Sequence, residues 1–305
     1  MTTAIALIAL VLGVSLVIAA ADAFVDGLLG AGRRLGVAPF VLVVGLSGFE
    51  TENLAAGIAT NAKGLPGASA GTFLGGMTFL AWGVAGLGGL ISPMRAELPR
   101  RFAAWTALGA VPLLAFGLDG NLSRREGAFL VAWFALALFG LAGSAGEQLV
   151  AMDDEAVKRR PLMRLVGGLA GLTAGGWLLG EGLRGIVRHL GVSSTLLGNT
   201  ALAASVEAEE LARVAVPARR GRPELALGNI AGTIIHFASL NAGVIALVKP
   251  LRLAPATTSF YLPAASASPI VFAALLRARH RLGRVEGAVL LALYAGYIAV
   301  ALTVA

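Results

Sequence analysis

The chain has 305 residues, of which 57% are hydrophobic and 13% are charged, and its mean hydropathy is +0.82. A soluble globular protein carries about 25% charged residues, so this composition excludes a soluble domain and predicts an integral membrane protein. The net charge of +7 comes from basic residues between apolar stretches, which argues against a nucleic-acid partner, and the absence of cysteine excludes disulfides and thiolate chemistry.

Apolar stretches long enough to cross a bilayer, which takes about 20 residues, recur along the whole chain. The ten predicted spans are 4–27, 37–61, 67–91, 102–118, 127–145, 163–183, 192–214, 224–248, 258–276 and 285–304. The longest polar segment, 147–162, divides the chain into five-span halves of residues 1–146 and 163–305. The fold class expected is therefore an all-α integral membrane protein of ten transmembrane helices.

The distribution of basic residues predicts the orientation in the membrane. With the N-terminus outside, 17 of the 24 Lys and Arg residues fall in inside segments, including Arg213, Arg219, Arg220 and Arg222. Short cytoplasmic loops are enriched in Lys and Arg. We therefore expect a multi-pass plasma-membrane protein with both termini outside and segment 147–162 as a cytoplasmic linker.

One acidic motif occurs twice. Residues 48–53 read Gly-Phe-Glu-Thr-Glu-Asn, residues 205–210 read Ser-Val-Glu-Ala-Glu-Glu, and the offset between them is 157 residues (207 − 50). The same offset maps Gly64 onto Gly221 and Pro66 onto Pro223. Such a shared register indicates a duplicated unit, with one motif region at 45–80 and the other at 198–240. Five spans are an odd number, so the halves would be inverted repeats, which is typical of secondary transporters with a site near the membrane midplane.

The motif carboxylates are expected to bind a cation. An acidic residue at the centre of a membrane helix costs about 2.5–3.5 kcal/mol, so such residues persist where they face a polar cavity. Positions i and i+3 share a helix face, which pairs Glu50 with Asn53 and Glu207 with Glu210. These four are the predicted metal ligands, and their oxygens suit Ca²⁺, Mg²⁺, Mn²⁺, Na⁺ or protons.

A second acid in each motif falls on another helix face. Glu52 and Glu209 lie about 200° around an ideal helix from Glu50 and Glu207. We expect them to point away from the ligand face and to serve as vestibule or proton-accepting groups. Close carboxylates without a cation favour protonation of at least one, which makes proton coupling natural.

The residues after each motif resemble the α-repeats of the cation/Ca²⁺ exchanger superfamily. The family spacing from Glu210 is kept by Gly221, Ala226, Leu227, Gly228, Asn229 and Gly232, and the first repeat keeps Gly48, Gly64, Gly71 and Gly75. The resemblance implies an antiporter that needs no cofactor, binds Ca²⁺ between the repeats and uses Na⁺ or H⁺ as counter-ion.

The resemblance also implies roles for individual residues, with departures from the family pattern. Glu210 falls on the ion-binding Glu of the family, whereas its partner in the first repeat is Asn53. The polar residues that Na⁺-coupled members place 27 positions later are Leu80 and Phe237 here. The further groups expected near the site are the backbone carbonyls near Phe49 and Val206, and the side chains of Thr72, Asn229, Thr233 and His236.

The expected function is a secondary-active cation antiporter, with Ca²⁺ or a related cation exchanged for H⁺ or Na⁺. The expected partners are the lipid bilayer and small inorganic cations, and a monomer is sufficient. A passive cation channel and a Na⁺/H⁺-type exchanger on the same scaffold remain alternatives. A more remote alternative is an intramembrane glutamic peptidase, because Glu209 and Glu210 are adjacent, although only His236 and His280 follow them. The transported ion, the counter-ion, the stoichiometry and the direction stay open.

Overall fold

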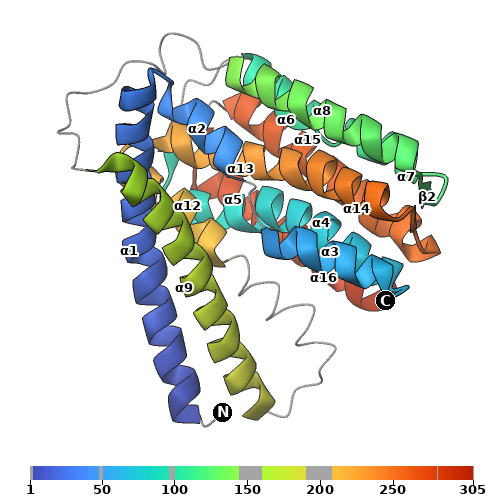
Figure 1. The fold of residues 1–305 in the computed structure, drawn as a ribbon, viewed down its shortest axis with the longest axis horizontal. Helices are drawn as coiled ribbons and strands as arrows, with labels where there is room; N and C mark the ends of the chain where they lie inside the picture. Colours follow the sequence, from blue (N-terminus) through green and yellow to red (C-terminus); the bar gives the residue numbers. More distant parts are fainter. Residues whose placement is uncertain are drawn as a thin grey trace.

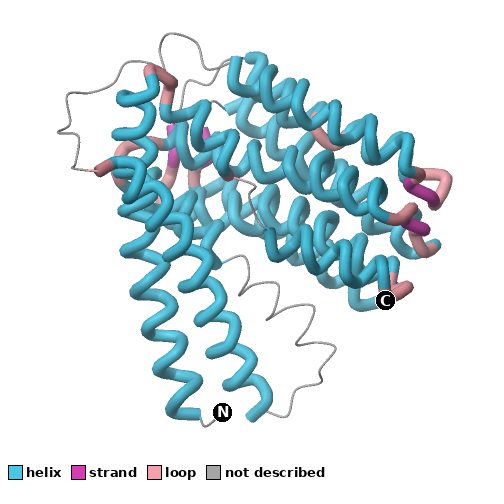
Figure 2. The backbone as a smooth tube through the Cα atoms, in the orientation of Figure 1, coloured by secondary structure: helices cyan, strands magenta, loops and turns pink. Residues whose placement is uncertain are grey.

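The computed structural model describes residues 3–47, 51–95, 100–143, 160–189, 208–279 and 281–304, and almost all of them are helical (Figure 2). The elements before the polar linker are α1 (Thr3–Leu35), α2 (Pro39–Leu46), α3 (Thr51–Ala62), α4 (Pro66–Thr78), η1 (Phe79–Val84), α5 (Ala85–Ile91), β1 (Met94–Arg95), α6 (Arg100–Leu108), α7 (Val111–Gly117), β2 (Asn121–Leu122) and α8 (Arg124–Gly143). The prediction of an all-α membrane protein is confirmed.

The elements after the linker are α9 (Pro161–His189), α12 (Ala208–Arg219), α13 (Pro223–Ile235), η4 (His236–Asn241), α14 (Ala242–Val248), β3 (Leu251–Arg252), η5 (Thr257–Tyr261), α15 (Leu262–Arg279), β4 (Arg281–Leu282) and α16 (Arg284–Val304). Most of the predicted linker 147–162, up to residue 159, lies outside the described residues. The three η elements of the described residues are π-helical turns, which widen a helix locally.

Seven helices of the described chain are long and apolar enough to cross a membrane. They correspond to seven of the ten predicted spans. Span 102–118 instead contains the shorter helices α6 and α7, span 37–61 contains the separate helices α2 and α3, and most of span 192–214 lies outside the described residues.

One continuous series of elements occurs in both halves. The offset of 157 residues carries α3 onto α12, α4 onto α13, η1 onto η4, α5 onto α14 and β1 onto β3, with both bounds of each element matching. Gly64 and Gly221 occupy the same turn of each half with φ of 75° and 70°, a left-handed conformation that glycine adopts without strain. The repeated motif is therefore followed by the same backbone path in each half.

Helices α1 and α9 run side by side as a long pair that crosses the direction of the other helices (Figure 1). Glycines bring the two backbones together: a Cβ on Gly168 of α9 would lie 2.6 Å from the Phe24 nitrogen of α1. Aliphatic side chains such as Leu7, Val11 and Ile18 cover the exposed side of α1. That apolar surface suits contact with lipid rather than water.

The interior is built around α13 and η4, whose residues 225–239 are all buried. In the described part of the chain, two short antiparallel ribbons join the halves, because β1 pairs with β4 and β2 pairs with β3. The most buried helix of the second half is thus held against elements of the first half, including α2. The candidate site lies at that contact.

Candidate functional site

The first turn of α12 carries two adjacent buried carboxylates. Glu209 is 2% exposed and Glu210 is 0% exposed. Acidic side chains in the first helical turn interact favourably with the N-terminal end of the helix dipole. The local sequence therefore supports a helix start here, although the burial of two carboxylates still requires a compensating positive charge.

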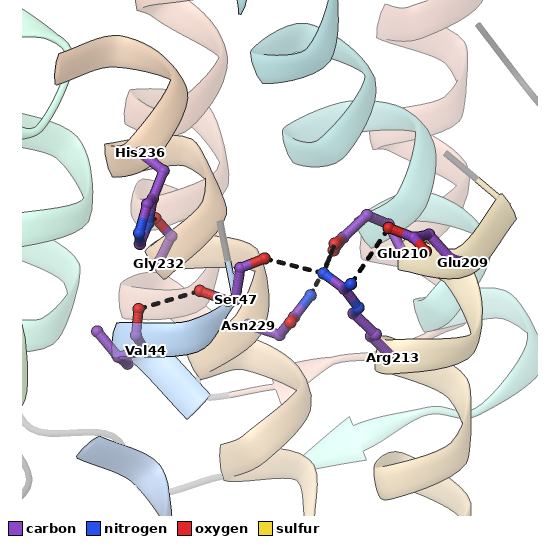
Figure 3. A network of polar contacts seen from close by, with 8 residues as sticks. All are labelled: Val44, Ser47, Glu209, Glu210, Arg213, Asn229, Gly232 and His236. Atoms are coloured by element: carbon purple, nitrogen blue, oxygen red, sulfur yellow. Dashed lines mark hydrogen bonds and ion pairs between the residues drawn. The ribbon is translucent and has the colours of Figure 1, made fainter. Parts of the chain in front are cut away.

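Arg213, one turn further along α12, supplies that charge. Its Nη1 lies 2.6 Å from Glu210 Oε1, and its Nη2 lies 3.2 Å from Glu209 Oε1. Nη1 also donates a hydrogen bond of 2.9 Å to the carbonyl oxygen of Ser47, at the C-terminal end of α2. Figure 3 shows the guanidinium between the two carboxylates and Ser47. Arg213 is only 3% exposed, so the whole cluster is closed off from solvent.

The close approach of α2 and α13 brings the end of α2 to this cluster. Gly232 of α13 lies directly against Val44 and Ser47, and a Cβ added there would overlap the Ser47 hydroxyl. A glycine at this position is therefore required for the two helices to touch. Its counterpart Gly75 has nothing within 4 Å of such a Cβ among the described residues.

Helix α13 adds an amide and a hydroxyl to the site. Asn229 donates a 2.5 Å hydrogen bond from Nδ2 to Glu210 Oε2. Asn229 Oδ1 and Thr233 Oγ1 are buried and have no hydrogen-bond partner among the described residues. The two residues are one helical turn apart, which places them on one face of α13. Buried polar oxygens normally have a partner, so these two oxygens suit a bound cation.

Most of the other predicted ligands lie outside the described residues. Glu50 and Glu207, and Phe49 and Val206 with their carbonyls, lie outside the described residues, as does the side chain of Glu52. Asn53 is partly buried in the first turn of α3, the position in its half that Glu210 holds in the other. Glu210 and Asn229 are thus brought together, and the assignment of the remaining ligands stays a prediction.

Thr72 and His236 are turned to local backbone partners. The Thr72 hydroxyl donates to the Ser69 carbonyl at 2.8 Å. The His236 Nδ1 lies 2.9 Å from the Gly232 carbonyl, and its ring packs edge-on against Phe134 at 4.6 Å between centroids. In Figure 3, His236 lies beyond Gly232, apart from the carboxylates.

Two expectations from the sequence are wrong. Arg213 does not lie in an inside loop: it is buried in α12 because two carboxylates and a carbonyl surround it. Glu209 does not face an open vestibule: it is 2% exposed and pairs with Arg213, which also holds Glu210. A proton-accepting role for Glu209 stays a prediction. The sequence signal that identifies this cluster is the spacing Glu209–Arg213 and Glu210–Arg213, at i,i+4 and i,i+3.

The two positions that follow the motif by 27 residues are filled by apolar packing. Leu80 and Phe237 are both buried, and the Phe237 ring lies where a side chain on Gly76 would otherwise sit, 2.7 Å from its hypothetical Cβ. Glycine in one half therefore makes room for the phenyl ring of the other half. Oxygen ligands from these side chains are absent at both positions.

The described carboxylates and amide form a compact polar site inside an apolar helical bundle. Among the described residues there is no group of three or more His, Cys, Asp or Glu side chains that could hold a metal ion by itself. Charged groups inside a membrane bundle mark substrate and ion pathways. The fold and the site together define a membrane transporter with a buried charged centre.

The chain belongs to the sodium/calcium exchanger protein family, whose pattern matches residues 5–143 and 161–303. It is 29% identical over 96% of its length to the putative antiporter CaxA of Alkalimonas amylolytica, covering 97% of that protein. It is 26% identical over 81% of its length to the inner membrane protein YrbG of Escherichia coli, again covering 81% of that protein. The predicted resemblance to the cation/Ca²⁺ exchanger superfamily is confirmed.

The fold matches a solved exchanger structure over nearly the whole chain. A structure of the sodium-calcium exchanger NCX_Mj, soaked with Na⁺ and Sr²⁺, superposes with a TM-score of 0.83 at 22% identity, covering 98% of this chain and 99% of that one. Because the chain belongs to the exchanger family, the protein is a transporter rather than an enzyme, and the glutamic peptidase alternative is wrong.

Proposed function

We propose that the chain is a secondary-active cation antiporter in the plasma membrane, with ten crossings arranged as two inverted halves and both termini outside. The observation that carries the proposal is the contact of Glu210 on α12 with Asn229 on α13, buried beside the end of α2. Helix ends that meet near the middle of a bundle are the ion sites of transporters built from repeats. Alternating access would expose this site to each side in turn.

The chemistry of the site favours a hard cation such as Ca²⁺. The ligand groups that the described residues offer are the Glu210 carboxylate, the amide oxygen of Asn229 and the hydroxyl of Thr233, all of them oxygens. Ca²⁺ takes six to eight such ligands, so the predicted ligands Glu50, Asn53 and Glu207 would complete the set. No resident cofactor is needed, and one chain carries both halves of the site, so a monomer suffices.

The counter-ion we favour is the proton. Leu80 and Phe237 offer no oxygen where Na⁺-coupled relatives are expected to place polar side chains, and Phe237 fills the space beside Gly76. Carboxylates close together have competing charges, and protonation of one relieves the repulsion when the cation leaves. Na⁺ coupling, or exchange of Na⁺ for H⁺, is the second candidate.

The experiment is uptake of radioactive Ca²⁺ into proteoliposomes, measured under an outward Na⁺ gradient and separately under a pH gradient. We expect uptake that saturates and follows the pH gradient, and we expect Glu210→Gln and Glu50→Gln each to reduce it by at least about tenfold, since each removes a charged ligand. Glu126→Gln is the matched control. Its carboxylate accepts hydrogen bonds from Ser123 at the start of α8 and lies outside the proposed site.

Each outcome separates the candidates. Flux that does not saturate and needs no counter-ion gradient would identify a passive channel. Uptake driven only by Na⁺ would reverse our choice of counter-ion. Full flux in both Glu→Gln variants would remove the proposed site altogether.

A further inference from the structure

Arg213 places a fixed positive charge where the transported cation would need the Glu210 carboxylate. Its Nη1 pairs with Glu210 Oε1 at 2.6 Å, while the Asn229 amide donates a hydrogen bond to Glu210 Oε2. Both oxygens of the carboxylate are therefore engaged by groups of the protein. A metal ion can use Oε1 only if the guanidinium withdraws from it.

The charge pair is confined to one half of the duplication. The offset of 157 residues maps Glu210 onto Asn53 and Arg213 onto Ala56. The first half thus has a neutral pair at the same i,i+3 positions where the second half has an acid and a base. The positive charge of Arg213 thus occurs in the half that has the carboxylate of Glu210, and it serves as the counter-charge of that carboxylate.

The guanidinium also has contacts that do not involve Glu210. It donates to the Ser47 carbonyl on α2 at 2.9 Å, and it lies over the Phe24 ring of α1 at 6.0 Å from the centroid. A cation over an aromatic face is stabilised electrostatically. These contacts, together with Glu209, can hold Arg213 after Oε1 is given up, so withdrawal does not require the arginine to leave the protein interior.

We infer that Arg213 is a tethered competitor of the transported cation: it neutralises Glu210 between transport events and is displaced from Oε1 when a cation binds. The inference rests on the proposed antiport function and adds the residue that sets its cation affinity. A bound cation then gains the carboxylate at the expense of an existing ion pair, which keeps affinity moderate and favours release. Cation binding also shifts the guanidinium toward Ser47 and Phe24. The contacts of Arg213 with α1 and the end of α2 therefore change when the site is occupied.

The test is Arg213→Gln, which keeps a hydrogen-bonding side chain and removes the charge, compared with Arg213→Lys, which keeps the charge. An opposite charge beside a carboxylate changes its affinity for a competing cation by about tenfold or more, as it does for a proton. We expect Arg213→Gln to lower the KM for Ca²⁺ uptake by at least about tenfold, and to lower the maximal rate because release becomes slow. Arg213→Lys is expected to stay near the wild-type KM.

A second readout does not depend on transport. The melting temperature of purified protein is measured with Ca²⁺, with Na⁺, and with a chelator in Na⁺-free buffer. We expect the wild type to change little between these conditions, since Arg213 substitutes for the cation. Arg213→Gln is expected to melt much lower in chelator and to be rescued by the cation. Should it fold poorly, the double variant Glu209→Gln/Arg213→Gln, which preserves net charge, is measured in its place.

Arg220→Gln is the matched control, because Arg220 also pairs with two carboxylates, Asp22 and Asp26, but away from Glu210. Its KM is expected to equal that of the wild type. If Arg213→Gln leaves KM unchanged and loses only stability, Arg213 is a structural ion pair and the inference is overturned. If wild type shows no cation-driven flux and Arg213→Gln shows no cation-dependent melting, the proposed function itself fails, and the inference fails with it.

Discussion

Thr233 has a buried hydroxyl whose oxygen has no hydrogen-bond partner among the described residues. We predict that Thr233→Val, which keeps the shape and removes the hydroxyl, raises the KM for cation uptake by about three- to tenfold, the value of one neutral hydrogen bond or ligand. The melting temperature is expected to stay equal or to rise slightly, because the valine leaves no buried polar group to satisfy. Uptake kinetics and thermal unfolding measure the two effects separately.

Thr106→Val is the control for this change. Thr106 is equally buried, but its hydroxyl donates to the Phe102 carbonyl at 2.9 Å and lies on α6. The KM of the Thr106→Val variant for cation uptake should not change. Equal KM values for Thr233→Val and Thr106→Val would show that the Thr233 oxygen does not take part in cation binding.

Among individual residues, the sequence predicts Glu210 and Asn229 at the site but not Arg213, which pairs with Glu210. Ideal helix geometry places the backbone positions of Glu207 and Glu209 on different faces. It does not include the length of the Arg213 side chain, which bridges Oε1 of Glu209 and Oε1 of Glu210. A count of basic residues for topology treats Arg213, next to the predicted end of span 192–214, as part of the adjacent inside segment, although its side chain is buried.

At the scale of elements, the α1–α9 pair depends on glycines that face the partner backbone. Gly168→Val would place side-chain atoms against the Phe24 backbone, where a Cβ lies 2.6 Å from the nitrogen. We predict a loss of about 1–3 kcal/mol of stability, as for other overpacked sites, and a matching fall in melting temperature. The neighbouring Gly167 has nothing within 4 Å of an added Cβ among the described residues, so Gly167→Val is the control.

The same pair of variants also reports on flux. If α1 and α9 must shift relative to each other during transport, Gly168→Val should slow uptake even at temperatures where it is folded, while Gly167→Val should not. Identical melting curves for the two variants would contradict the close packing described for this pair.

Helix content was predictable from hydropathy, whereas helix interruptions were not. Span 37–61 reads as one apolar stretch, but α2 ends at Leu46 and α3 begins at Thr51. The π-helical turns η1 and η4 also carry no clear local signal, since Phe79–Val84 and His236–Asn241 share only the alanine at their third position. They occur at matching positions because both halves inherit one backbone path, and tertiary packing maintains the widened turns.

At the scale of the whole molecule, the duplication extends beyond the part that sequence comparison detects. Glu126 accepts a hydrogen bond from the backbone nitrogen of Ser123 at the start of α8, and Glu286 accepts one from Gly283 at the start of α16. The offset here is 160 residues (286 − 126), three more than in the motif region. The second half has three more residues between α14 and α16 than the first half has between α5 and α8, so a gap-free comparison loses the repeat although the capped helix start recurs.

If the halves are inverted, as we propose, equivalent positions lie on opposite sides of the membrane. Arg124 and Arg284 are equivalent at this offset, and both are exposed. The chain has no cysteine, so single Arg124→Cys and Arg284→Cys variants carry one thiol each. We predict that a membrane-impermeant maleimide added to intact cells labels Arg124→Cys, on the outside, and labels Arg284→Cys only after permeabilisation. This expectation follows from the excess of basic residues in the inside segments.

The labelling experiment distinguishes inversion from orientation. Labelling of both thiols from the same side would rule out inverted halves, because the two helix starts would then face one compartment. The opposite pattern, with Arg284→Cys labelled in intact cells, would keep the inversion and reverse the orientation. Denatured samples of both variants, in which each thiol must react, control for expression. Only the predicted pattern supports both inverted halves and outside termini, and it would place the start of α16 in the cytoplasm.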